Sequence, residues 1–222
     1  MSLKSSFVLA ACFCFGTAAL AQSDEAIADG ETLLKTLQIR VSVGEVWPQD
    51  LAIARFYLLE LRRAAGKLPE AAFCEQAQAE LRIASTIEGD EVTKAGLIER
   101  KEAIEAMTRS PELCKQSIAA IDAFLFDSGE PPPTPEAVAE ARNKYRTGDI
   151  DRSTLLDLEA GLAEAQVAAG KLTREAYCAS GQRATLGQLV DSVEQRASVG
   201  QAGLLERLAA KRRLWAFRAL CR

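Results

Sequence analysis

The sequence predicts an all-α protein made of two homologous helical modules, each stapled by a disulfide bond. Its composition is rich in Ala, Leu, Glu, Arg and Gln, which lose little side-chain freedom in a helix. Aromatic residues make up only 6% of the chain, which argues against a β-sheet protein. In addition, one ten-residue stretch occurs twice, and cysteines recur with it.

The repeated stretch reads AGKLPEAAFC at residues 65–74 and AGKLTREAYC at residues 169–178, with six of ten positions identical. The turn VGEV at 43–46 returns as TGDI at 147–150, again 104 residues later. The segment AGLIER at 95–100 returns as AGLLER at 202–207, with an offset of 107 that Cys114 and Cys221 share. The simplest explanation is an internal duplication, with a net insertion of three residues between Cys178 and Ala202.

The N-terminus is typical of a secretory signal peptide. Lys4 precedes an apolar run over residues 7–20, and Ala19, Leu20 and Ala21 form a cleavage site of the A-x-A kind. We expect a signal peptide at 1–21 and a mature, exported chain that begins at Gln22. The alternative is a lipoprotein signal ending at Cys12, because LAAC at 9–12 resembles a lipobox.

Cleavage after Ala21 leaves four cysteines: Cys74, Cys114, Cys178 and Cys221. An even number in an exported chain predicts two disulfides, and the sequence permits three connectivities. If each module closes on itself, Cys74 pairs with Cys114 and Cys178 with Cys221. Pairing the equivalent cysteines of the two modules with each other is the symmetric alternative.

Module 1 is expected over 22–127, with a polar, frayed start at 22–29. Helices are predicted at 30–43, 48–65, 69–87, 92–108 and 111–126. Pro48 suits the first turn of its helix, and Ser110 is the expected N-cap before Pro111. Gly66 is expected to end the second helix in a left-handed conformation.

A linker at 128–135, rich in proline, separates this module from module 2 at 136–222. Thr134 is expected to cap a helix over 135–146, and Ser153 or Thr154 one that runs to Ala169. Thr173 is expected to cap a further helix that carries Cys178 near its start, and a last long segment runs to Cys221. Trp47 and Tyr145, which lie near the turn glycines, are interpreted as packing residues.

The chemistry-bearing motifs of common enzymes and cofactor proteins are not found. The chain has no histidine, which removes the commonest general base and transition-metal ligand, and its cysteines lack C-x-x-C spacing. A net charge of −4 does not indicate binding to nucleic acid. The sequence therefore predicts no cofactor, no metal and no enzymatic activity.

One carboxylate pair and one basic segment nevertheless need interpretation. Glu99 and Glu206 occupy equivalent positions of the repeat; they are either a duplicated acid site, as in an enzyme acting on cell-wall polymer, or helix-surface ion pairs with Arg100 and Arg207. The C-terminal segment combines cations and aromatic side chains and predicts either a helix that binds an anionic membrane surface or acidic partner, or one docked on its own module. Its candidate binding residues are Arg207, Lys211, Arg212, Arg213, Trp215, Phe217 and Arg218.

Residues 139–166, which begin AEARNKYRTGDI, resemble the helical hairpin of TolC-type outer-membrane efflux proteins. In that family a turn of the pattern A-x-x-x-Y-x-x-G-x-[IV] joins two long periplasmic helices. The resemblance implies a helical hairpin around Gly148 and, more faintly over 37–61, one around Gly44. No functional residue is carried over. The leading hypothesis is a non-enzymatic, periplasmic interaction or scaffolding module that binds another envelope protein.

Overall fold

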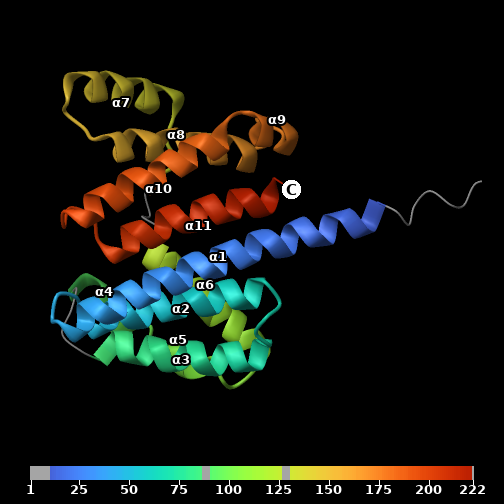
Figure 1. Ribbon diagram of the computed structural model, residues 1–222, viewed down its shortest axis with the longest axis vertical. Coiled ribbons are helices and arrows are strands. Elements are labelled where there is room, and N and C mark those ends of the chain that lie inside the picture. The colour runs from blue at the N-terminus through green and yellow to red at the C-terminus, as the bar shows by residue number, and fades with distance from the viewer. Residues whose placement is uncertain (1–10, 87–90, 127–130, 222) are drawn as a thin grey trace, which may run out of the picture. The chain divides into compact units, whose positions relative to one another are not determined.

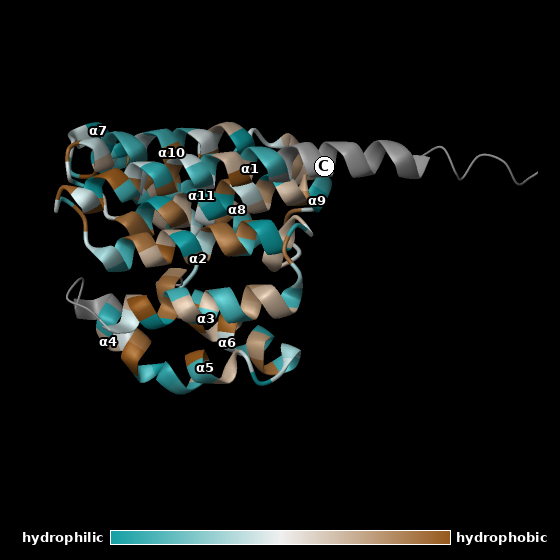
Figure 2. Ribbon diagram, turned by 60° about the horizontal axis from the view of Figure 1, so that its bottom comes forward, coloured by the Kyte–Doolittle hydropathy of each residue, from teal (hydrophilic) through white to brown (hydrophobic). Residues whose placement is uncertain are grey.

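The computed structural model describes residues 11–86, 91–126 and 131–221 of the chain, and the side chains of 24–86, 94–126 and 131–221. Every regular element in these ranges is a helix, and the chain divides into two compact units, Met1–Ser128 and Gly129–Arg222 (Figure 1). In each unit, hydrophobic and hydrophilic residues alternate along the helices (Figure 2). Each unit therefore buries the apolar stripes of amphipathic helices.

The first unit is arranged around α2 and α3. Helix α2 packs against α1 on one side and α3 on the other, and α3 also contacts α4, α5 and α6. Phe56, Tyr57 and Phe73 are at most 1% exposed and form the centre of this core. The helices are α1 (Ala11–Ser42), α2 (Pro48–Ala64), α3 (Glu70–Thr86), α4 (Glu91–Glu99), α5 (Lys101–Ala106) and α6 (Pro111–Phe126).

The second unit is arranged around α10, which packs against α8 and α11, while α7 covers α8 and the short α9 contacts α8, α10 and α11. Tyr177 and Phe217 meet edge to face in its core, with ring centroids 5.2 Å apart. Burial, with a contribution from the charge of Glu164, raises the pKa of Tyr177 to about 12, against an opposing contribution from Arg213. The helices are α7 (Pro135–Thr147), α8 (Arg152–Ala168), α9 (Arg174–Ala179), α10 (Gln182–Ser198) and α11 (Leu204–Leu220).

The two units share several local features. Helices α2 and α8 both have 17 residues and begin 104 positions apart. Gly66 and Gly170, which follow them, have φ angles of +70° and +67°, a region that favours glycine. In the second unit, however, Cys221 follows the last helix, whereas in the first unit Cys114 lies at the start of α6.

Three expectations about the elements are wrong. Residues 22–29 are helical rather than frayed, because Ala26 and Ile27 are buried and extend the packed face of α1 that Leu33 and Leu37 begin. The helix expected at 92–108 is divided at Arg100 into α4 and α5. The helix expected after Thr173 ends at Ala179, and α10 begins after Gly181, whose φ is +78°.

The expected N-caps at Ser110, Thr134 and Thr173 are confirmed by hydrogen bonds from the backbone amides of Leu113, Ala137 and Ala176. The expected cap of α8 is wrong: Asp151, rather than Ser153 or Thr154, occupies that position. In the part of the chain that the structure describes, we find no helix with the length and apolar character that crossing a membrane requires.

Candidate functional site

Each unit contains one disulfide bond, which joins two of its helical segments. Cys74 in α3 is bonded to Cys114 in α6, and Cys178 in α9 is bonded to Cys221 after α11. This is the pairing expected for modules that each close on themselves. Glu70 lies close enough to the first bond to complete a cluster of three metal-ligand residues, but both sulfurs are used in the disulfide. That cluster therefore offers no thiolate to a metal ion.

A groove runs beside the Cys74–Cys114 disulfide, between one face of α3 and the turn that joins α5 to α6. Its volume is about 460 Å³, within the range of small-ligand sites. Cys74, Gln78 and Met107 are buried at its floor. The remaining lining residues are Glu70, Ala71, Glu75, Thr108, Arg109, Ser110 and Pro111.

The polar groups of this groove are incompletely paired. One carboxylate oxygen of Glu70, Oε2, lies 3.6 Å from Arg63 Nη1. Its other oxygen, Oε1, is buried and accepts no hydrogen bond from any described residue. The buried Gln78 Nε2 donates a long hydrogen bond of 3.5 Å to the carbonyl oxygen of Glu105. Sequence reasoning missed this groove, because its walls come from segments that lie some thirty residues apart and carry no motif.

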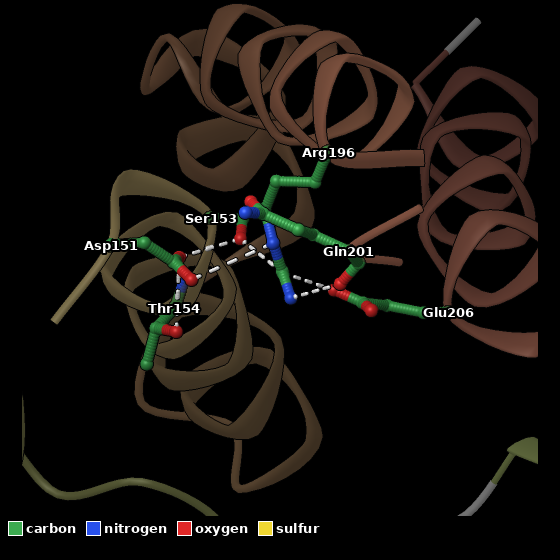
Figure 3. A network of polar contacts seen from close by, with 6 residues as sticks. All are labelled: Asp151, Ser153, Thr154, Arg196, Gln201 and Glu206. Carbon is green, nitrogen blue, oxygen red and sulfur yellow. Dashed lines mark hydrogen bonds and ion pairs between the residues drawn. The ribbon is translucent and has the colours of Figure 1, made fainter. Parts of the chain in front are cut away.

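In the second unit, a polar network joins α8, α10 and α11 (Figure 3). Asp151 Oδ1 accepts hydrogen bonds from the hydroxyl of Ser153 (2.6 Å) and from the backbone amide of Thr154 (2.8 Å). Arg196 Nη1 donates to Ser153 Oγ at 2.8 Å and also to the Glu206 carboxylate. Arg196 Nη2 donates to the carbonyl oxygen of Gln201 at 2.9 Å. Arg196 thus connects all three helices.

This network also affects the pKa of Asp151. Burial alone raises the pKa of its carboxyl group, but hydrogen bonds from Ser153 and Thr154 and the charge of Arg196 outweigh burial and lower the pKa below the usual 3.8. A pocket of about 240 Å³ adjoins the network and is also lined by Arg213. Because Arg213 is paired with Asp157 and Glu164, the cations beside this pocket already have carboxylate partners. We interpret the network as a structural tie between helices.

The predicted basic surface at the C-terminus lies on α11, with its charges largely directed into the unit. Arg207 Nη2 lies 2.7 Å from a Glu194 oxygen, and Lys211 Nζ lies 3.3 Å from the other oxygen of that carboxylate. Phe217 is only 4% exposed. Arg212 is partly buried, and Arg218 stacks on the Trp215 ring, 4.2 Å from its centroid. The expectation of a docked helix agrees with these contacts, and binding to an anionic membrane stays a prediction.

The two candidate carboxylates fall in different units. Glu99 is exposed at the end of α4, and Glu206 pairs with Arg196 in the first turn of α11. The expected pairing of Glu206 with its neighbour Arg207 is wrong, because Arg207 turns to Glu194 on α10. In the first unit, Arg100, which follows Glu99, donates a hydrogen bond from Nε to the carbonyl oxygen of Ala120. The carboxylate of Glu206 is therefore held in an ion pair with Arg196 inside the second unit.

Three large apolar side chains gather at the turn between α1 and α2, which we call the α1–α2 tip. Ile39, Val43 and Trp47 are 66%, 63% and 55% exposed. Between them, Gly44 adopts a φ of +75°, and the Glu45 amide donates to the Arg40 carbonyl oxygen at 2.9 Å. The expectation that Trp47 and Tyr145 are packing residues is wrong, since Tyr145 at the α7–α8 turn is also 41% exposed.

Comparison with known protein families, characterised proteins and solved structures finds no match to this chain. The resemblance of residues 139–166 to the hairpin of TolC-type proteins stays a prediction, although α7 and α8 do form a hairpin, with a φ of +80° at Gly148.

Proposed function

We propose that this protein is an exported, non-enzymatic interaction module, which binds an apolar surface of another envelope protein through the α1–α2 tip. The observation that carries the proposal is the exposure of Ile39, Val43 and Trp47 within nine residues of chain. Ile39 and Val43 lie one helical turn apart and share a face. Exposed apolar side chains that form a contiguous patch mark protein interaction sites, whereas exposed apolar residues that lie singly are normal.

The two disulfides support the compartment part of the proposal. Such bonds persist in oxidising environments, such as the periplasm or the extracellular space. Cleavage of a signal peptide after Ala21 would leave Ala26, Ile27, Leu33 and Leu37, the buried residues of α1, in the mature chain. The packed face between α1 and α2 is therefore compatible with export.

We also propose that the two units arose by internal duplication. The equal lengths of α2 and α8, their matching glycine turns and the recurring cysteines support it. The apolar tip is not repeated, because Asn143, Thr147 and Asp151 stand where the first unit has Ile39, Val43 and Trp47. After duplication, the first unit would thus have acquired, or kept, the binding surface alone.

Site-specific photo-crosslinking tests the proposal. A benzophenone amino acid is introduced singly at positions 39, 43 and 47, and at the exposed positions Gln76 and Lys115 of the same unit as controls. After irradiation of intact cells, we expect one common crosslinked product from the three tip positions and none from the controls. Val43→Lys combined with the probe at position 47 should abolish that product, because the lysine charge would have to be desolvated.

Two outcomes contradict the proposal. One is the absence of a product at all three tip positions. The other is a product with twice the mass of the chain itself, which would identify a second copy as the occupant.

A further inference from the structure

The two disulfides close chain segments of similar length but lie in different surroundings. Their cysteines are 40 and 43 residues apart, so loop-closure entropy does not distinguish the two bonds. Burial does distinguish them, because Cys74 and Cys114 are 4% and 0% exposed, whereas Cys178 and Cys221 are each partly exposed. The Cys178–Cys221 bond does not involve the α1–α2 tip, so its chemistry is independent of the proposed function.

The Cys74–Cys114 bond is protected by the helices that carry it. Cys74 lies in α3, which has 17 residues, and Cys114 lies in the first turn of α6, which has 16. The groove described above reaches Cys74 but leaves it only 4% exposed, and Cys114 is fully covered. A disulfide is reduced when a thiolate reaches one of its sulfur atoms, so burial slows the reaction. Rapid reduction of this bond therefore requires that the packing around α3 and α6 first opens.

The Cys178–Cys221 bond lies at the periphery of the second unit's core, against which both cysteines pack. Cys178 belongs to α9, a helix of six residues, and Cys221 follows the last residue of α11. Ala179 and Ser180, which follow Cys178, are exposed, and Leu220 next to Cys221 is 37% exposed. A thiolate in solvent can therefore reach this bond without the unfolding of a long helix.

The same bond ties α9 to α11. Beside it, Arg174 donates a hydrogen bond from Nη2 to the carbonyl oxygen of Leu220, and the ring of Tyr177 contacts that of Phe217. A helix of six residues is not stable by itself in water, because helix nucleation is unfavourable. Without the covalent bond, α9 depends on noncovalent contacts of this kind, whereas the long helices α8 and α11 remain packed on α10. Reduction should therefore loosen α9 before it affects the three long helices.

We propose that Cys178–Cys221 is a reversible redox site, at which a dithiol reduces the bond and releases α9 while Cys74–Cys114 stays closed. One thiolate of the dithiol attacks one sulfur atom, forms a mixed disulfide and expels the other cysteine as a thiolate. The second thiolate of the dithiol then attacks the mixed disulfide, which closes the dithiol's own disulfide and expels the second cysteine thiolate. Two electrons and two protons thus pass from the dithiol to the cysteine pair. In an oxidising compartment without such a dithiol, the bond is closed.

The first test is a time course in which excess dithiothreitol reduces the folded, oxidised chain. Samples are quenched with N-ethylmaleimide, which labels free thiols, and their peptides are analysed by mass spectrometry. We expect Cys178 and Cys221 to be labelled together, at least about tenfold faster than Cys74 and Cys114. In guanidinium chloride, where burial is lost, the two bonds should be reduced at similar rates. The proposal is overturned if the folded chain shows equal rates or faster reduction of Cys74–Cys114, or if the difference persists in guanidinium chloride.

The second test follows α9 by hydrogen exchange after the selective reduction. We expect faster exchange of the α9 amides and unchanged exchange in α2 and α3. Cys178→Ser combined with Cys221→Ser should reproduce this pattern without a reductant. The matched control, Cys74→Ser combined with Cys114→Ser, keeps the second bond and should leave exchange in α9 unchanged. Replacing dithiothreitol by oxidised glutathione should restore the Cys178–Cys221 bond and slow the exchange again. Unchanged exchange in α9 after reduction, or failure of the bond to form again, would contradict the proposal.

Discussion

Asp151 stabilises the second unit through two contacts. Its carboxylate caps α8 through the Thr154 amide, and it also lies 3.7 Å from the Arg196 guanidinium. Asp151→Ala should lower the local stability of α8 by about 1 kcal/mol, as loss of an N-cap does. Native-state hydrogen exchange of the α8 amides measures this directly. Asp191→Ala, which removes an exposed aspartate from α10, is the matched control and should change exchange little.

The same residue contributes to acid sensitivity. Because the pKa of Asp151 is lower in the folded protein than its usual value of 3.8, its stabilising effect is present above that pH and is lost as pH falls through the folded pKa. Asp151→Asn keeps a capping oxygen but cannot titrate. The stability difference between wild type and Asp151→Asn should therefore be constant near neutral pH and shrink below about pH 4. A difference that grows on acidification, in urea unfolding at several pH values, would contradict this.

Two helical glycines should respond in opposite directions to replacement by alanine. A Cβ atom on Gly96 would lie 1.8 Å from Phe124 Cζ, so the ring would have to move. The Arg100 guanidinium, which stacks on this ring 4.6 Å from its centroid, opposes that movement. Gly187 in α10 has no atom within 4 Å of that position. We expect Gly96→Ala to cost about 1–3 kcal/mol of unfolding free energy. Gly187→Ala should instead add about 0.5–1 kcal/mol, and equal thermal shifts in the two variants would refute the packing argument.

At the scale of single residues, the sequence predicts the features that depend only on residues close in the chain. The caps Ser110, Thr134 and Thr173 could be predicted because each accepts a hydrogen bond from the backbone amide only three residues further along the chain. The assignment failed at α8, where Asp151 lies just before two other residues that cap helices well. It also failed for Trp47, because side-chain exposure depends on packing between helices rather than on residue type.

At the scale of helices, the bounds of α2, α3 and α6 agree with the sequence pattern to within one residue. The two breaks that the pattern misses have different causes, one a contact between helices and the other a local backbone conformation. Arg100 leaves helical geometry where its guanidinium reaches the Ala120 carbonyl oxygen on α6. At Ser180–Gly181, the positive φ of Gly181 allows the chain to turn from α9 into α10. Hydrophobic periodicity carries no information about either break.

Helix α11 shows how charge composition can mislead. Because Arg207, Lys211 and Arg213 are paired with acids on α8 and α10, we expect the protein to float poorly with anionic liposomes. Efficient flotation that is lost on combining Arg212→Glu with Arg213→Glu would instead support the membrane-binding interpretation.

The pairing of Arg213 has its own consequence for stability. Its side chain is 22% exposed and contacts both Asp157 and Glu164. Arg213→Glu should destabilise the second unit by about 1–3 kcal/mol, since it leaves three carboxylates together. Arg183→Glu makes the same charge change at an exposed position of α10 and should have little effect. Thermal unfolding of the two variants separates a specific pair from a change in net charge.

At the scale of the whole molecule, the repeat and the cysteine count are what made the architecture predictable. Cysteine is rare enough that its recurrence at matched offsets favours a bond within each module. The candidate sites were less predictable. The α1–α2 tip requires knowledge of which side chains remain uncovered, and the groove joins α3 to the distant α5–α6 turn. Neither property is encoded in a local pattern.

The central claim is that each unit is a helical module closed by its own disulfide in an oxidising compartment. Non-reducing peptide mass spectrometry of protein alkylated in intact cells tests it most directly. We expect peptides that join Cys74 to Cys114 and Cys178 to Cys221, with no alkylated thiol at these four positions. Alkylated cysteines, or peptides that join the two units, would contradict the account.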